Sequence, residues 1–300
     1  MATPRPITID LPTHSVAALE WGPSDGPLAI LLHGFPDTAH TWRHLGPHLG
    51  EQGWHVVAPF SRGYAPTGPA PDGNYELAAL VSDVIDIYGA LNGTDEAIVV
   101  GHDWGSAVAS GVASTALGKF SAAVLMAVPP LAALTAQAWP PKVFVKNGPV
   151  WLRQLPRSWY MLVAQTPLLT DKLIETLWAR WAPDYDYTQD LGHIRRALPT
   201  AAHKKAALSY YRALWNPLYK SAEYSAERRR VFGKPKVRTL CLHGADDVCI
   251  RAELNAHSLA VLPRGSDVTT IERAGHFFHL EQPQMVNSLI DSFVGSPRSS

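Results

Sequence analysis

The chain is poor in cysteine, carries no net charge and has no apolar run long enough to cross a membrane. Its two cysteines, Cys241 and Cys249, are too few for a disulfide framework. Lys and Arg number 26, and so do Asp and Glu, which makes nucleic acid and anionic membranes poor candidates for a partner. The longest apolar segment, 120–134, is divided by Pro129 and Pro130 and is too short to span a bilayer.

The remaining composition is that of an ordinary globular protein. Of the 300 residues, 46% are apolar and 17% are charged, which suits one large domain or a core with an insert. Residues 1–14 contain proline and charge but no apolar stretch of signal-peptide length. We therefore expect a soluble, cytoplasmic protein; its oligomeric state is left open.

Two parts of the chain alternate segments typical of buried strands with segments of helical spacing. The predicted strands are 27–32, 55–59, 97–100, 122–128, 237–242 and 268–271. The predicted helices are 41–50, 77–91, 106–117 and 283–294. Apolar strands without alternation, each followed by a helix, indicate an α/β fold whose mostly parallel sheet has helices on both faces.

The stretch between these two parts has a different character. From 131 to 224 the pattern is helical, dense in Trp and Tyr, and without a convincing strand. The simplest organisation is an α/β core in two parts, 1–129 and 231–300, interrupted by a helical cap, or lid, over 130–230.

The most informative motif is Gly101-His102-Asp103-Trp104-Gly105, directly after the apolar run 97–100. Small residues two positions either side of a polar one let the backbone turn sharply and expose that side chain, as in a nucleophile elbow. The elbow residue here is Asp103, although an Asp before a helix could also be an N-cap. A carboxylate in this place attacks carbon and leaves an ester that water must later cleave.

Such a nucleophile needs donors for the oxyanion of the ester intermediate. These donors are backbone N–H groups of the residue after the nucleophile and of the loop after an earlier strand. Trp104 supplies the first, and Phe35 in the segment His33-Gly34-Phe35-Pro36 is the candidate for the second.

A carboxylate nucleophile also needs a base that activates water and an acid that orients this base. His276 directly follows a strand-ending glycine, which places it at the same edge of the sheet as the elbow; His279, three residues on, is the alternative. Asp247, three residues beyond Gly244, is the predicted acid, with Asp246 as the alternative.

No metal or other cofactor is implied. His40, His44 and His48 recur every four residues, which could place three ligands along one helix face. Gly46 and Pro47, however, are expected to break that helix, and the set spans too much length to hold one ion.

Four of these segments together resemble the α/β-hydrolase-fold epoxide hydrolases, with the haloalkane dehalogenases as close relatives. They are His33-Gly34-Phe35-Pro36, Gly101-His102-Asp103-Trp104-Gly105, Gly244-x-x-Asp247 and Gly275-His276. The resemblance covers most of the chain. It implies that a small apolar epoxide and water give a vicinal diol through a covalent alkyl ester of Asp103.

In that family two lid tyrosines hold and protonate the epoxide oxygen. Residues 159–167 are similar to the family's Tyr…Phe-Gln-x-Pro stretch, and residues 208–212 to its Asn-Trp-Tyr-Arg segment. The resemblance thus implies Tyr160 and Tyr211 as proton donors that contact substrate with Phe35 and Trp104. Tyr210 is an alternative for the second donor.

The chain departs from the family in two places and leaves alternatives open. Ser209-Tyr210 replaces Asn-Trp, and residues 59–64 lack the usual Asp before x-Arg-Gly. An epoxide leaves as a strongly basic alkoxide and needs a phenol to protonate it, whereas a halide leaves without a proton. Tyrosines therefore favour an epoxide hydrolase over a haloalkane or haloacid dehalogenase that uses the same Asp. A non-catalytic ligand-binding protein of this fold is the remaining alternative.

Overall fold

The computed structural model describes residues 2–138, 149–150, 152–163 and 170–297. One eight-stranded sheet runs through it in the order β1-β2-β4-β3-β5-β6-β7-β8. All neighbours from β4 to β8 pair in parallel, while β1 and β2 are antiparallel to each other and β2 to β4. The strands are β1 Arg5–Asp10, β2 Ser15–Trp21, β3 Leu28–Leu32, β4 His55–Pro59, β5 Ile98–His102, β6 Ala122–Met126, β7 Arg238–Gly244 and β8 Asp267–Ile271.

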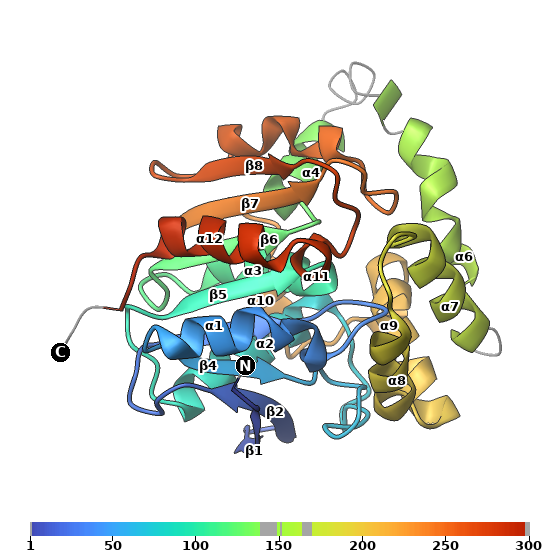
Figure 1. Ribbon diagram of the computed structural model, residues 1–300. Coiled ribbons are helices and arrows are strands. Elements are labelled where there is room, and N and C mark those ends of the chain that lie inside the picture. The colour runs from blue at the N-terminus through green and yellow to red at the C-terminus, as the bar shows by residue number, and fades with distance from the viewer. Residues whose placement is uncertain (1, 139–148, 151, 164–169, 298–300) are drawn as a thin grey trace.

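Helices cover both faces of this sheet (Figure 1). On one face lie α1 (Leu45–Glu51) and α12 (Pro283–Val294), and on the other α2 (Leu77–Ala90) and α3 (Trp104–Thr115). Every residue of β3, β4, β5 and β6 is buried, because parallel strands between two helical layers have no wet face. The predicted α/β fold with a mostly parallel sheet is confirmed.

The regular elements that the structure describes between β6 and β7 are all helices, joined by turns. Its elements are α4 Leu131–Ala138, η2 Leu155–Trp159, α6 Tyr160–Val163, α7 Thr170–Trp181, α8 Thr188–Ala197, α9 Ala201–Trp215, η4 Pro217–Tyr219 and α10 Ser225–Arg228. In Figure 1 helices α7, α8 and α9 lie beyond the ends toward which the parallel strands point. They therefore stand at the edge of the sheet where the predicted site residues collect. The short elements η1 Ala39–Arg43, η5 Ala252–Ala260 and α11 Phe278–Glu281 complete the chain.

Two sequence-based expectations need correction. The antiparallel hairpin of β1 and β2, which precedes the first predicted strand, was not predicted from the sequence. Most of β1 is exposed at the sheet edge, so it lacks the buried apolar run by which the other strands were recognised. The predicted helix 41–50 is divided at His44, between η1 (Ala39–Arg43) and α1, and not at Gly46 and Pro47, which lie within α1. Pro47 is the third residue of α1, in the first turn, where a backbone N–H has no intrahelical partner and proline is tolerated.

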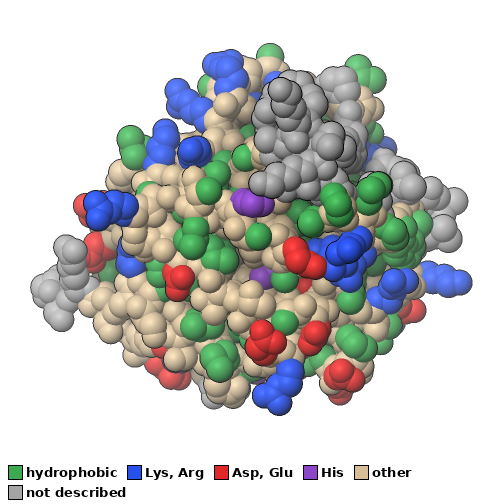
Figure 2. All heavy atoms as spheres, turned by 90° about the horizontal axis from the view of Figure 1, so that it is seen from above, with side chains coloured by type: hydrophobic (Ala, Val, Ile, Leu, Met, Phe, Trp, Pro, Cys, Tyr) green, Lys and Arg blue, Asp and Glu red, His purple; other side chains and the backbone are tan. Residues whose placement is uncertain are grey.

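The surface on the face of Figure 2 mixes basic, acidic and apolar side chains without an extended patch of one sign. Among the described residues, no helix combines the length and the apolar character needed to span a bilayer.

The turn between β5 and α3 brings three backbone segments into close contact. Asp103 adopts φ +53° and ψ −116°, a region that side chains rarely enter. A Cβ on Gly101 would lie 2.0 Å from the carbonyl oxygen of Gly105, and one on Gly105 would lie 2.0 Å from that of Leu32. The packing of the elbow therefore requires both glycines, and the end of β3 lies in contact with the first turn of α3.

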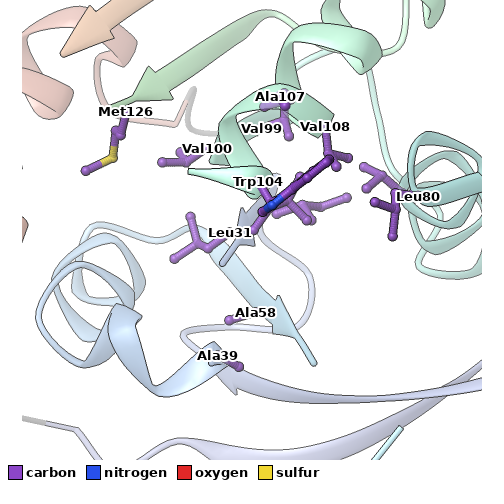
Figure 3. Packing of buried hydrophobic residues seen from close by; sticks show 14 of the residues in the cluster. Leu31, Ala39, Ala58, Leu80, Val99, Val100, Trp104, Ala107, Val108 and Met126 are labelled. Carbon is purple, nitrogen blue, oxygen red and sulfur yellow. The ribbon is translucent and has the colours of Figure 1, made fainter. Parts of the chain in front are cut away.

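Apolar core residues pack against Trp104, the residue that follows the turn. Figure 3 shows the Trp104 ring pointing toward Val108 and Leu80, with Val99 and Val100 of β5 beside it. Trp104, which directly follows Asp103, is 9% exposed. The aromatic ring thus fastens the first turn of α3 to the core.

Gly105→Ala should destabilise the protein by about 1–3 kcal/mol or more, since the new methyl group overlaps backbone atoms that cannot rotate away. Gly89→Ala is the matched control. Gly89 lies near the end of α2 with nothing within 4 Å of a built Cβ, so alanine should stabilise by about 0.4–1 kcal/mol. Urea unfolding of both variants measures the difference; equal effects would contradict the role assigned to the elbow glycine.

Candidate active site

Asp103 presents its carboxylate to two backbone donors at the carboxyl edge of the sheet. Its Oδ1 accepts the N–H of Phe35 at 2.8 Å, and the N–H of Trp104 lies close enough to lower the pKa of the carboxyl. Phe35 belongs to the loop after β3, and Trp104 opens α3. These are the two N–H groups named from the sequence, and Phe35 contacts Oδ1 rather than Oδ2 of the carboxylate.

His276 and Asp247 lie in a row behind the carboxylate of Asp103, in the order Asp103, His276, Asp247. The Nδ1–H of His276 donates to Oδ2 of Asp247 at 2.9 Å, and the Nε2 of His276 lies 3.7 Å from Oδ2 of Asp103. The remaining oxygen of Asp247 accepts the backbone N–H groups of Cys249 and Ile250 at 2.7 and 3.1 Å. The imidazole is thus fixed in orientation and faces Asp103.

Burial and neighbouring charges shift the pKa values of these three residues in opposite directions. Burial lowers the pKa of His276, but Asp247 and Asp103 outweigh it and raise the pKa above its usual range. Burial raises the pKa of Asp247, but the His276 charge outweighs it and brings the pKa below its usual range. For Asp103 burial prevails over His276 and the two N–H groups, so its pKa is raised. Asp247 is therefore the member of the row that stays ionised most readily.

The alternative residues point elsewhere. Asp246 is exposed, while Asp247 is buried and bonded to His276. The Nε2 of His279 lies 2.6 Å from the hydroxyl of Thr41. Among these candidates the structure brings His276 and Asp247 into line with Asp103, and it does not bring His279 or Asp246 there.

Two buried tyrosines from the helices between β6 and β7 stand over this row. The rings of Tyr160 and Tyr211 are 5.8 Å apart, and the Tyr211 ring lies 5.2 Å from Trp104 and 5.6 Å from Phe35. Burial above all, together with the charge of Asp103, raises the pKa of both phenols well above 10. Both hydroxyls therefore stay protonated and able to donate.

Their polar contacts distinguish them from Tyr210. The Tyr211 hydroxyl makes no hydrogen bond of regular geometry in the described part of the chain, although the Trp104 side chain lies near enough to lower its pKa. The Tyr210 hydroxyl instead donates to the carbonyl of Arg62 at 2.6 Å. Tyr160 lies in the described part of its motif, but residues 164–167, which include the Gln-x-Pro portion of the resemblance, lie outside the described residues.

Two further residues at the site were not singled out from the sequence. The thiol of Cys249 lies 3.6 Å from the Tyr160 hydroxyl, and the Trp181 ring lies 4.7 Å from the His276 ring. Cys249 follows the predicted acid by two residues, a proximity that could have drawn notice to it. Trp181 sits on α7 among many aromatic residues, and no sequence pattern marks it.

The three histidines of the first helical region do not converge. His40 stacks on His193 with ring centroids 3.8 Å apart, and His48 pairs with Asp291 at 2.6 Å. Among the described residues, two other groups each bring three ligand atoms within 4.8 Å of one another. They are Asp37, His102 and His279, and Asp103, Cys249 and His276.

Comparison with known proteins supports the same architecture. The chain is 28% identical over 280 residues to AB hydrolase superfamily protein YfhM of Bacillus subtilis, which covers 91% of this chain and 92% of that protein. It is 33% identical over 132 residues to Epoxide hydrolase A of Mycobacterium tuberculosis, covering 44% and 41%.

Solved structures share the fold at low sequence identity. One, from work on novel epoxide hydrolases in metagenomes from hot environments, superposes with a TM-score of 0.78 at 23% identity, covering 98% of this chain and 99% of that one. Epoxide Hydrolase A from Mycobacterium thermoresistibile gives 0.73 at 19% identity, covering 99% and 100%. Residues 27–283 match the model of the alpha/beta hydrolase fold family. Because this match covers most of the chain, the protein belongs to that family.

Proposed function

We propose that this α/β hydrolase is an epoxide hydrolase, which converts a small apolar epoxide and water to a vicinal diol through an ester of Asp103. The observation that carries the proposal is the pairing of a buried elbow carboxylate with two protonated phenols above it and a His–Asp pair behind it. Relatives named epoxide hydrolase support it.

In the first step Oδ2 of Asp103 attacks one carbon of the epoxide. A C–O bond to the carboxylate forms while one C–O bond of the ring breaks, and the electron pair goes to the ring oxygen. Tyr160 and Tyr211 donate hydrogen bonds to that oxygen and supply its proton, which a strongly basic alkoxide requires in order to leave. The Phe35 N–H holds Oδ1 in place during the attack.

In the second step water cleaves the ester. The Nε2 of His276 takes a proton from water, whose oxygen attacks the ester carbonyl carbon. The oxyanion that forms on Oδ1 is held by the N–H groups of Phe35 and Trp104. Asp247 stabilises the imidazolium of His276. When the intermediate collapses, the ester C–O bond breaks and the departing alkoxide takes the proton of that imidazolium, which frees the diol. The acid proton left on Asp103 returns to the phenolate formed in the first step, so that the carboxylate, the imidazole and both phenols are restored.

We assign the helices between β6 and β7 to a cap that closes over the site. In this division residues 1–129 and 231–300 form the core, and residues 130–230 carry the two tyrosines. The rings of Tyr160, Tyr211, Trp104 and Trp181 pack against one another with centroids 5.2 to 5.8 Å apart, which makes a largely apolar cluster beside the site. Such a lining suits an apolar epoxide and excludes water from the alkylation step.

His276→Ala should still open the epoxide but stall as the ester, because the base for water is lost. Intact mass after exposure to terminal epoxides should show an adduct equal to a whole epoxide, and Asp103→Asn should show none. Full turnover in Asp103→Ala would overturn the proposal. An adduct of an alkyl group without its bromide, formed from bromoalkanes alone, would assign the protein to the dehalogenases.

Tyr211→Phe should lower kcat by about 10- to 100-fold, less than the loss of a sole general acid, since Tyr160 still donates. The matched control is Tyr210→Phe, which removes a hydroxyl bonded to the Arg62 carbonyl and should change stability without this loss of kcat. Steady-state kinetics on one epoxide compares the two variants, and an equal loss in both would contradict the assignment.

Asp247→Asn should move the acid limb of the pH profile for ester hydrolysis to lower pH. The Asp247 charge raises the pKa of His276, so its removal lowers that pKa and the neutral base persists to lower pH. The rate should fall by up to about 10⁴-fold, as orientation of the base is lost. Single-turnover kinetics against pH measures both effects. Asp246→Asn is the control, and an unchanged profile in Asp247→Asn would exclude His276 as the titrating base.

A further inference from the structure

We propose that the site also binds a thiophilic divalent cation such as Zn²⁺ or Cd²⁺ through Asp103, Cys249 and His276, and that the bound ion blocks the reaction. The ligand atoms of these three residues all lie within 4.8 Å of one another. All three side chains are buried, with Cys249 and His276 fully so. Carboxylate, thiol and imidazole are together a donor set that favours zinc over magnesium or calcium.

The distance between the histidine and carboxylate donors requires little movement to reach a metal geometry. The Nε2 of His276 and Oδ2 of Asp103 lie 3.7 Å apart. Two such ligands, each about 2.0–2.2 Å from a tetrahedral zinc ion, would be roughly 3.3–3.5 Å apart. A shift of a few tenths of an ångström therefore suffices for these two donors.

The donor atoms are not committed to other strong partners. The Nε2 of His276 is a buried nitrogen without a hydrogen-bond partner in the described part of the chain. Phe35 occupies Oδ1 of Asp103 rather than Oδ2. Within the described ranges the hydrogen-bond contact of the Cys249 thiol is the one with the Tyr160 hydroxyl, at 3.6 Å. Three convergent donors with free lone pairs are what a cation site requires.

The second nitrogen of the imidazole is held as in established zinc sites. The Nδ1–H of His276 donates to Asp247 at 2.9 Å, which leaves Nε2 as the lone-pair nitrogen and aims it at Asp103. A carboxylate behind a ligating histidine fixes the tautomer and raises the basicity of the ligand. The orientation that serves the base thus also serves a metal ion.

The chemistry of binding explains why the ion would inhibit. A thiol must lose its proton to ligate, so Zn²⁺ binding forms a Zn–S bond and releases one proton to solvent. The ion then occupies the lone pair with which His276 would accept a proton from water. It also engages the oxygen with which Asp103 would attack, so both steps of the proposed reaction stop.

The test is a titration of the wild-type protein with Co²⁺ and then Zn²⁺, without substrate. We expect a near-ultraviolet thiolate-to-cobalt charge-transfer band that Zn²⁺ abolishes by displacement. Cys249→Ala should lose the band and bind Zn²⁺ at least about tenfold more weakly. Cys241→Ala is the matched control: Cys241 is the only other cysteine and is buried within β7, so its removal should change neither result.

Inhibition provides a second readout. Zn²⁺ should inhibit epoxide turnover of the wild type and of Cys241→Ala, and the inhibition constant for Cys249→Ala should rise by the same factor as its dissociation constant. Cys249→Ser, which restores a small polar side chain of similar size, replaces Cys249→Ala if the latter does not fold by circular dichroism.

Three results would overturn the inference: no charge-transfer band in the wild type, the same band in Cys249→Ala, or zinc affinity lost in His279→Ala and retained in Cys249→Ala. The last would place the ion at Asp37, His102 and His279, a group without a cysteine. Because the cobalt spectrum needs no substrate, a failure of the proposed epoxide activity would leave this test intact, and the two failures remain distinguishable.

Discussion

The free energy cost of burying the carboxylate of Asp103 is the constraint on which the rest of the site depends. A carboxylate that is 4% exposed must have its charge compensated, and the protein does this with the Phe35 and Trp104 N–H groups and with His276. In the proposed mechanism the same two N–H groups hold the oxyanion when the charge reappears on Oδ1 during ester hydrolysis. The resting state and that transition state would then use one set of donors, which need not reorganise between them.

These donors can converge because the sheet is parallel. Phe35 follows β3, Asp103 follows β5, Asp247 follows β7 and His276 follows β8. The carboxyl ends of parallel strands meet at one edge, so four segments that are distant in the sequence reach a common point. The elbow glycines then let β3 and α3 approach closely enough for the Phe35 N–H to reach the carboxylate.

The imidazole of His276, which compensates the charge of Asp103, also exposes the site to inhibition by a metal ion in our proposal. An imidazole fixed by Asp247 and aimed at a carboxylate is a good base, and for the same reason it is a good metal ligand. Cys249 adds a third donor beside it, since the loop that supplies Asp247 also carries this thiol. In our proposals, catalysis and metal inhibition are therefore two consequences of one arrangement of lone pairs.

The sequence alone determined the parallel core, the elbow at Asp103 and the resemblance to epoxide hydrolases, because buried strands and a Gly-x-Asp-x-Gly turn leave local signatures. It favoured Asp247 and Tyr211 but left Asp246 and Tyr210 open as alternatives, since neighbouring residues differ in direction rather than in type. It also missed the β1–β2 hairpin, whose edge strand is mostly exposed, and the place of Cys249 and Trp181 beside His276. Those features depend on which side chains the tertiary packing turns toward one point, and no local pattern records that direction.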